Sequence, residues 1–346
     1  RTAGAPTSFI NGWNTIGSGS GRAAADVPPM PVGSGHPRSI GFDRRADDGP
    51  LLRSWKGPMG RQQRTFVVGV DASAESDEAL DWTRSTAGPD DVIVVVHAWD
   101  VVSAVMLDEH TEVPSTELDQ IAERAVAELT DRLGDPRIEG TTRQGHAGKQ
   151  IVQCADDRDA DTIVVGHSGS GRASVVLGST ANHVIHHTTR PVVVVRGERR
   201  DTPELIVVGA DDQDVDDDGE NESVRALRWA YGLEGARIIE VVHSWFMPSV
   251  VAGRFSGPGV DFEEYDRAAI EVAERVIAAA GEIPEGLDVR TAALNGTPEF
   301  ALIEASREAD LVVVGSRGRG GFAGLVLGST SLDLTAHAHC PVAIVR

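Results

Sequence analysis

Two glycine-rich stretches carry the residue types that bind phosphate. One covers residues 310–330 and reads DLVVVGSRGRGGFAGLVLGST, and the other covers residues 161–180 and reads DTIVVGHSGSGRASVVLGST. In each, a short apolar run is followed by glycines and ends in Gly-Ser-Thr ahead of a helical pattern. Glycines let the main chain approach a ligand closely, and the N–H groups at a helix start attract anions. The sequence therefore predicts two phosphate-binding loops.

The composition is that of a soluble globular protein. The chain has 346 residues, 40% of them hydrophobic, a formal net charge of -21 and only two cysteines. No apolar run approaches the roughly 18 residues that a membrane helix needs, and the N-terminus has no apolar core of signal-peptide length. The negative charge argues against nucleic acid and anionic membranes as partners. Two isolated cysteines fit a reducing compartment, so we expect a cytoplasmic protein.

Three segments follow one another along the chain. Residues 1–62 are rich in Gly, Ser, Pro and Arg without a lasting period, which predicts a disordered extension. Residues 63–198 and 203–346 then show the same alternation of apolar strands and amphipathic helices. Continuous apolar strands alternating with helices indicate a parallel sheet that is covered on both faces. We therefore expect two tandem doubly wound α/β domains, each with a five-stranded parallel sheet.

The expected elements repeat in the same order in the two domains. In the first domain, strands are expected at 65–71, 91–99, 138–143, 162–165 and 191–196, and helices at 76–86, 115–133, 148–156 and 179–187. In the second, strands are expected at 205–209, 236–243, 287–293, 311–314 and 342–346, and helices at 223–231, 262–280, from 298 and up to 336.

Residues 65–346 resemble the universal stress protein family in its tandem two-domain form. The nucleotide-binding signature of that family is Gly, two residues, Gly, nine residues, Gly, then Ser or Thr. The second repeat fits it without a gap, and the first has eight residues in the long spacer. The resemblance implies an adenine nucleotide alpha hydrolase-like fold. The matching sets are Gly315, Gly318, Gly328 and Ser329, and Gly166, Gly169, Gly178 and Ser179.

The resemblance also implies a ligand and its contacts. An adenine nucleotide, usually ATP, would lie where the first and fourth strands part, as ligands do at switch points of open α/β sheets. Domains of this family pair through their last strands, which implies an internal pseudo-dimer and leaves a homodimer open. The implied contacts are Val70, Ala98, Ala210 and Ser244 with adenine, Asp71 and Asp211 with adenine or ribose, Gly166, Gly169, Gly315 and Gly318 with ribose and phosphate, and Gly178, Ser179, Thr180, Gly328, Ser329 and Thr330 with the phosphates.

Each repeat departs once from this pattern. In the first, the shortened spacer affects the placement of Ser179. In the second, seventeen residues separate Asp211 from Trp229, whereas ten separate Asp71 from Trp82, so an acidic insertion has entered the loop. Unit charges about 4 Å apart repel by about 4 kcal/mol at an effective dielectric near 20. The insertion therefore predicts either Mg²⁺-dependent binding or a loop that moves away from the phosphates.

The same motifs also have interpretations that involve no ligand. The glycine loops could be tight turns without a ligand, and Asp71 and Asp211 could cap the loops that follow them. Residues 214–219 match the first half of a calcium loop, but its twelfth position is Arg225, which favours a solvated acidic loop. Residues 166–173 lack the lysine of a P-loop and the last glycine of a nucleophile elbow. The histidines at 183, 186 and 187 are interpreted as structural.

Three classes of function remain open. The leading hypothesis is an adenine-nucleotide-binding protein with a regulatory or stress-response role. The second is a scaffold that binds a protein partner and has lost its nucleotide, which the two departures favour. The third is a weak ATP hydrolase, but no side chain is an evident general base, and whether the protein is an enzyme stays undecided.

Overall fold

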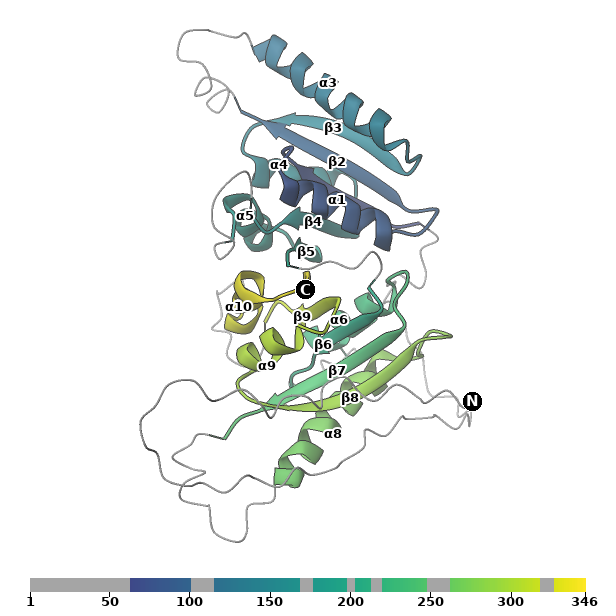
Figure 1. Cartoon of the computed structure of the whole chain (residues 1–346), viewed down its shortest axis with the longest axis vertical. Helices are drawn as coiled ribbons and strands as arrows, with labels where there is room; N and C mark the ends of the chain where they lie inside the picture. The colour runs from purple at the N-terminus through teal and green to yellow at the C-terminus, as the bar shows by residue number, and fades with distance from the viewer. Residues whose placement is uncertain are drawn as a thin grey trace, which may run out of the picture.

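The computed structural model describes residues 63–100, 115–168, 177–197, 203–212, 220–247, 262–317 and 327–346. The extension 1–62, the predicted site residues Gly169 and Gly318, and the calcium-like segment 214–219 lie outside the described residues. The remaining residues form strands and helices in the order that the sequence predicts, arranged around a single sheet (Figure 1).

The first half of the sheet has the strand order β3-β2-β1-β4-β5, with every pair parallel. Its inner strands are almost fully apolar and buried, as expected for a sheet covered on both faces. The bounds are β1 Thr65–Val70, α1 Ala74–Thr86, β2 Val92–Trp99, α3 Ser115–Leu133, β3 Ile138–Gln144, α4 Ala147–Asp157, β4 Thr162–Gly166, α5 Ser179–His187 and β5 Val192–Val195.

The second half repeats this arrangement with the order β10-β9-β6-β7-β8, again with parallel neighbours. The tandem five-stranded domains predicted from the sequence are thereby confirmed. The bounds are β6 Leu205–Gly209, α6 Glu222–Tyr231, β7 Ile238–Trp245, α8 Phe262–Ala280, β8 Asp288–Asn295, α9 Pro298–Ala305, β9 Leu311–Gly315, α10 Ser329–His337 and β10 Val342–Val345.

The two halves join through their last strands. β5 and β10 pair antiparallel, with Val193 opposite Ala343, so that one sheet of ten strands runs through the molecule. Figure 1 shows the C-terminus at this junction, between the two halves. The pairing confirms the internal pseudo-dimer. It also protects two apolar strand edges that would otherwise be open to pairing with another chain.

Helices cover both faces of the sheet. Apolar side chains of α1, α6 and α8 pack on one face in a core that includes Trp82 and Leu227. Side chains of α4, α5, α9 and α10 pack on the other face in a core that includes Ile185 and Leu334. Both cores contain strand residues from the two halves, so the halves share their hydrophobic interior.

Two arginines at corresponding positions link each half to a helix of the other. Arg196, directly after β5, donates from Nη1 to the carbonyl oxygen of Thr335 in α10 at 2.7 Å. Arg346, directly after β10, donates to the carbonyl oxygen of Ile185 in α5. The last carbonyls of a helix have no intrahelical donor, and a cation favours that end of the helix dipole. Each half therefore stabilises the C-terminus of a helix that begins at the other half's predicted site.

Candidate functional site

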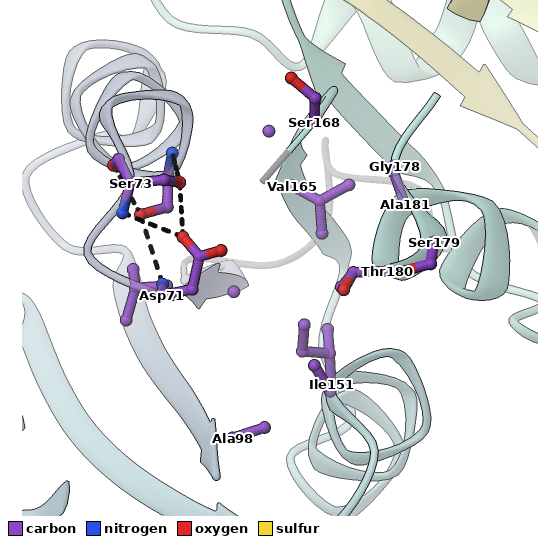
Figure 2. Close-up of a pocket in the computed structure, with 15 residues that line it drawn as sticks. Asp71, Ser73, Ala98, Ile151, Val165, Ser168, Gly178, Ser179, Thr180 and Ala181 are labelled. Carbon is purple, nitrogen blue, oxygen red and sulfur yellow. Dashed lines mark hydrogen bonds between the residues drawn. The ribbon is translucent and has the colours of Figure 1, made fainter. Parts of the chain in front are cut away.

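A pocket of about 110 Å³ opens at the carboxyl ends of the strands in the first half. It lies where β1 and β4 are neighbours and their connections diverge to β2 and β5. Such a switch point is where open α/β sheets bind ligands. Figure 2 shows Asp71 and Ser73 on one side of the pocket and Gly178, Ser179 and Thr180 on the other.

The pocket brings together the residues that the sequence predicts for the first domain. Seven of the eight line it, and the eighth, Gly169, lies outside the described residues. Their contacts with a nucleotide remain predictions. The seven are Val70, Asp71, Ala98, Gly166, Gly178, Ser179 and Thr180.

The start of α5 gives the pocket a wall suited to an anion. Gly178 is the N-cap and offers no side-chain acceptor, so the first N–H groups of the helix are not capped by it. Its own N–H donates to the His167 carbonyl oxygen at 2.7 Å, which ties the helix start to the end of β4. Within the described residues, the hydroxyls of Ser179 and Thr180 have no hydrogen bond to another side chain. Uncapped N–H groups, two hydroxyls and the helix dipole together favour phosphate.

Asp71 is positioned by a tight loop between β1 and α1. Its Oδ1 accepts from the Ser73 N–H at 3.0 Å, and Ser73 in turn caps α1 by accepting from the Ser76 N–H at 3.2 Å. Ala72 between them has φ of +61°, a left-handed conformation that is strained for alanine. Asp71 therefore does cap its loop, as the plainer interpretation expects. It also lines the pocket, so that interpretation and a ligand contact are compatible.

The other side of the pocket is apolar. Ala98 of β2 and Ile151 of α4 line it, and Ile151 is buried against Gly69 of β1. His97 holds the end of β1 through a hydrogen bond of 3.0 Å from Nδ1 to the Val70 carbonyl oxygen. An apolar wall opposite a polar one is the usual construction of a small-molecule site.

Gly166 has a structural reason in addition to its predicted contact with ligand. A Cβ at this position would lie 2.7 Å from the carbonyl oxygen of Glu75, so only glycine lets β4 end against the start of α1. The next residues continue this contact, because the Ser168 hydroxyl donates to Glu75 Oε1 at 3.4 Å. Glycine is required here for the protein's own packing.

Sequence reasoning did not identify eight of the residues that line the pocket. Ser73 could have been found, because a serine just before a helix is a capping signal, and Ser76 lies in the first turn of that helix. The others are placed by the packing of α4 and β4 against β1, which no local pattern encodes. The eight are Gly69, Ser73, Ser76, Ala147, Ile151, Val165, Ser168 and Ala181.

The second half repeats the scaffold of this site. His243 of β7 donates from Nδ1 to the Ala210 carbonyl oxygen at 2.8 Å, and the Gly328 N–H donates to the Ser316 carbonyl oxygen at 2.7 Å. Asp211 donates its N–H to Ser223 Oγ at 2.9 Å, at the start of α6. Ser244 lies in β7 next to these groups, in register with β8. The predicted residues of the second domain that the structure describes thus follow corresponding strands and begin a corresponding helix.

The acidic residues at the end of the insertion have different environments. Glu220 pairs with Arg228 at 2.6 Å, so its charge is neutralised by a residue of α6, the helix that follows it. The Glu222 carboxylate accepts from the Ser316 hydroxyl at 3.0 Å and from the Arg317 N–H, at the end of β9. Of these two glutamates, only Glu222 faces the strand end where the predicted site lies.

A further carboxylate lies at the start of α10. Glu299, near the N-terminus of α9, accepts hydrogen bonds from the hydroxyls of Ser329 at 3.1 Å and Thr330 at 3.4 Å. These are the two hydroxyls that the resemblance assigns to phosphate. The start of α5 in the first half has no such carboxylate among the residues that line its pocket, except for Asp71 on the opposite wall.

The histidines near the C-terminus of α5 form a stacked group. The His183 and His187 rings are parallel with centroids 3.9 Å apart, and His146 lies 5.1 Å from His183. In the part of the chain that the structure describes, no three His, Cys, Asp or Glu side chains are arranged to hold a metal ion. No helix in that part has the length and apolar character to cross a bilayer.

Comparison with known proteins agrees with this architecture. A universal stress protein of Mycolicibacterium smegmatis is 29% identical over 297 residues, which cover 81% of this chain and 96% of that protein. A universal stress protein of Mycobacterium tuberculosis is 30% identical over 304 residues, covering 83% and 98%. The crystal structure of a universal stress protein from Archaeoglobus fulgidus superposes with a TM-score of 0.55 at 20% identity, covering 83% of this chain and 99% of that one.

The sequence pattern of a whole family matches both halves. The matches cover residues 63–196 and 204–346, which together take in both halves of the sheet and both predicted sites. The chain therefore belongs to the universal stress protein family, with two of its domains in tandem.

Proposed function

We propose that the first domain binds an adenine nucleotide, ATP in the leading case, and that the protein acts through this binding in regulation or stress response. The uncapped start of α5, facing a pocket at the β1–β4 switch point, carries the proposal. The phosphates would accept hydrogen bonds from the N–H groups and hydroxyls of residues 178–180. The adenosine end would lie between Asp71 and the apolar wall formed by Ala98 and Ile151.

The proposal stops at binding. The structure describes no side chain placed as a general base toward a phosphate in this pocket, so hydrolysis is not part of it. Mg²⁺ enters only as a condition of the assay, because a metal ion neutralises charge on a triphosphate without needing a cage made entirely of protein. The proposed localisation remains the cytoplasm.

Calorimetric titration with ATP, ADP and AMP, each with and without Mg²⁺, tests the proposal. Affinity that falls from ATP to AMP would support phosphate contacts at α5. cAMP belongs in the series because one solved universal stress protein is described as its complex. Bound ligand should also raise the unfolding free energy, by about 2.7 kcal/mol at a concentration of 100 Kd.

One variant locates the site. Thr180→Glu places a carboxylate where the phosphates would lie. Repulsion between unit charges about 4 Å apart is worth about 4 kcal/mol at an effective dielectric near 20, so we expect ATP affinity to fall by about a thousandfold. Thr180→Ser keeps the hydroxyl and should bind nearly as well. Gln120→Glu adds the same charge on the exposed surface of α3 and is the matched control. Equal binding by Thr180→Glu and wild type would contradict the assignment.

A further inference from the structure

The two halves differ in the residue that occupies one position in the first turn of α4 and of α9. Gly145 and Gly296 each come directly after the third strand of their domain. Three residues further along the sequence, Gly148 of the first half corresponds to Glu299 of the second. Gly148 lies in the first turn of α4, and Glu299 lies in the first turn of α9. The first half therefore has no side chain at this position, and the second has a carboxylate.

The Glu299 carboxylate occupies an anion-binding arrangement. Its Oε1 accepts from Ser329 Oγ at 3.1 Å and from Thr330 Oγ1 at 3.4 Å, at the start of α10. It also lies in the first turn of its own helix α9, so it is close to the N-termini of two helices. Negative charge is favoured at the N-terminus of each of these two helices. These are the two hydroxyl contacts that a phosphate would make if the second domain bound nucleotide as the first is proposed to.

The protonation equilibrium of Glu299 agrees with this geometry. Burial raises the pKa of its carboxyl, but hydrogen bonds from its own N–H and from the hydroxyls of Thr297, Ser329 and Thr330 outweigh burial and lower the pKa below its usual value. The carboxylate is therefore ionised at neutral pH and serves as a fixed anion.

The first half is built without room for such a group. A Cβ at Gly148 would lie 2.6 Å from the Cβ of His183 in α5 and 2.9 Å from its Cγ. The residue that corresponds to His183 in α10 is Asp333, which is smaller. His183 therefore leaves no room for a side chain at position 148, whereas the Glu299 side chain reaches the start of α10.

We propose that Glu299 is an internal anion that fills the phosphate position of the second domain, so that the chain has a single open nucleotide site, in the first domain. Glu299 is then a specificity-determining residue, and the second domain is held in a ligand-like state by its own side chain. The proposal rests on the proposed function, since it assigns the nucleotide to one of two sites. Of the two phosphate-binding loops that the sequence predicts, it leaves only the first open to nucleotide.

Binding stoichiometry tests this inference. Titration of the full chain with ATP and Mg²⁺ should give one nucleotide per chain for the wild type and two for Glu299→Ala, which opens the start of α10. Glu299→Gln keeps the bulk of the side chain and should remain at one. Two nucleotides bound by the wild type, or one bound by Glu299→Ala, would overturn the inference.

A double variant removes the first site from the measurement. Thr180→Glu alone should bind no nucleotide at concentrations that saturate the wild type, and Thr180→Glu with Glu299→Ala should bind one. Circular dichroism and the urea midpoint of each variant confirm that it is folded. Two nucleotides bound by the wild type would refute the internal anion but leave the proposed function intact. Binding to the double variant but not to the wild type would refute the first-domain site and support the internal anion.

Discussion

Replacing Arg196 with methionine should destabilise the whole molecule, because this side chain links the two halves. Arg196 is buried, with 8% of its surface exposed, and its Nη1 donates to the Thr335 carbonyl oxygen at 2.7 Å. Hydrogen bonds from charged donors contribute about 1.5–3 kcal/mol each. The second acceptor, the Leu334 carbonyl oxygen, is 3.4 Å away and adds little. Burial lowers the pKa of Arg196, because desolvation disfavours its charged form.

The expected loss of unfolding free energy in Arg196→Met is the balance of these effects. Methionine retains most of the apolar stem, so the loss is chiefly the hydrogen bond and the carbonyl that is left without a donor. We expect the unfolding free energy to fall by about 2 kcal/mol. Equilibrium urea unfolding measures it, with Arg158→Met on the exposed surface as the control, which should change stability by less than about 0.5 kcal/mol.

Hydrogen exchange distinguishes a local from a general effect. In Arg196→Met, amides in the last turn of α10 should exchange faster. Amides of α3, at the far edge of the first half, should lose no more protection than the loss of global stability accounts for. The corresponding variant Arg346→Met should act on the last turn of α5 instead, because its acceptor is the Ile185 carbonyl. A stability loss below about 0.5 kcal/mol for Arg196→Met would show that the desolvation cost cancels the bond, and the reasoning would be refuted.

Two further predictions concern the sites. Gly166→Ala should lower the unfolding free energy by about 1–3 kcal/mol, because the new Cβ would meet the Glu75 main chain, which cannot move aside as a side chain can. Chemical denaturation measures this loss, and an unchanged denaturation midpoint would contradict the prediction. The lowered pKa of Glu299 stabilises the fold above the pKa of an unfolded glutamate, and this contribution is lost as pH falls through the lower folded pKa. The stability difference between wild type and Glu299→Gln should therefore shrink below about pH 4, and a difference that is constant from pH 7 to pH 3 would exclude this linkage.

The sequence predicted the elements well because their ends carry strong local signals. The helix predicted at 262–280 has those bounds, and so does the helix at 179–187, which begins after Gly178. Small errors have identifiable causes. The first helix begins at Ala74, two residues earlier than predicted, because Ser73 rather than a later residue is the cap. The strand predicted at 236–243 covers Ile238–Trp245, because pairing with β8 continues through its polar end.

Of the residues that line the pocket, the sequence predicted only those that belong to the repeated motif. Asp71 and the Gly-Ser-Thr ends were found because both repeats contain them at corresponding places. Ile151 was missed because it becomes a pocket residue only when α4 packs on Gly69. Glu299 was missed for the same reason, since its role depends on where α9 places it relative to α10. Contacts between elements that are distant in sequence have no local signature.

A difference at one position can separate the two sites because each half accommodates its own residue there. Gly148 packs against His183 of α5 without room for a Cβ, whereas the Glu299 side chain extends to the start of α10, and the strand order is the same in both halves. The same position borders the uncapped helix start that would receive a phosphate. An anion supplied by the chain costs less entropy to hold than one taken from solution, because it is already attached. A tandem domain can thus retain its shape and its pairing with the other half while giving up its ligand.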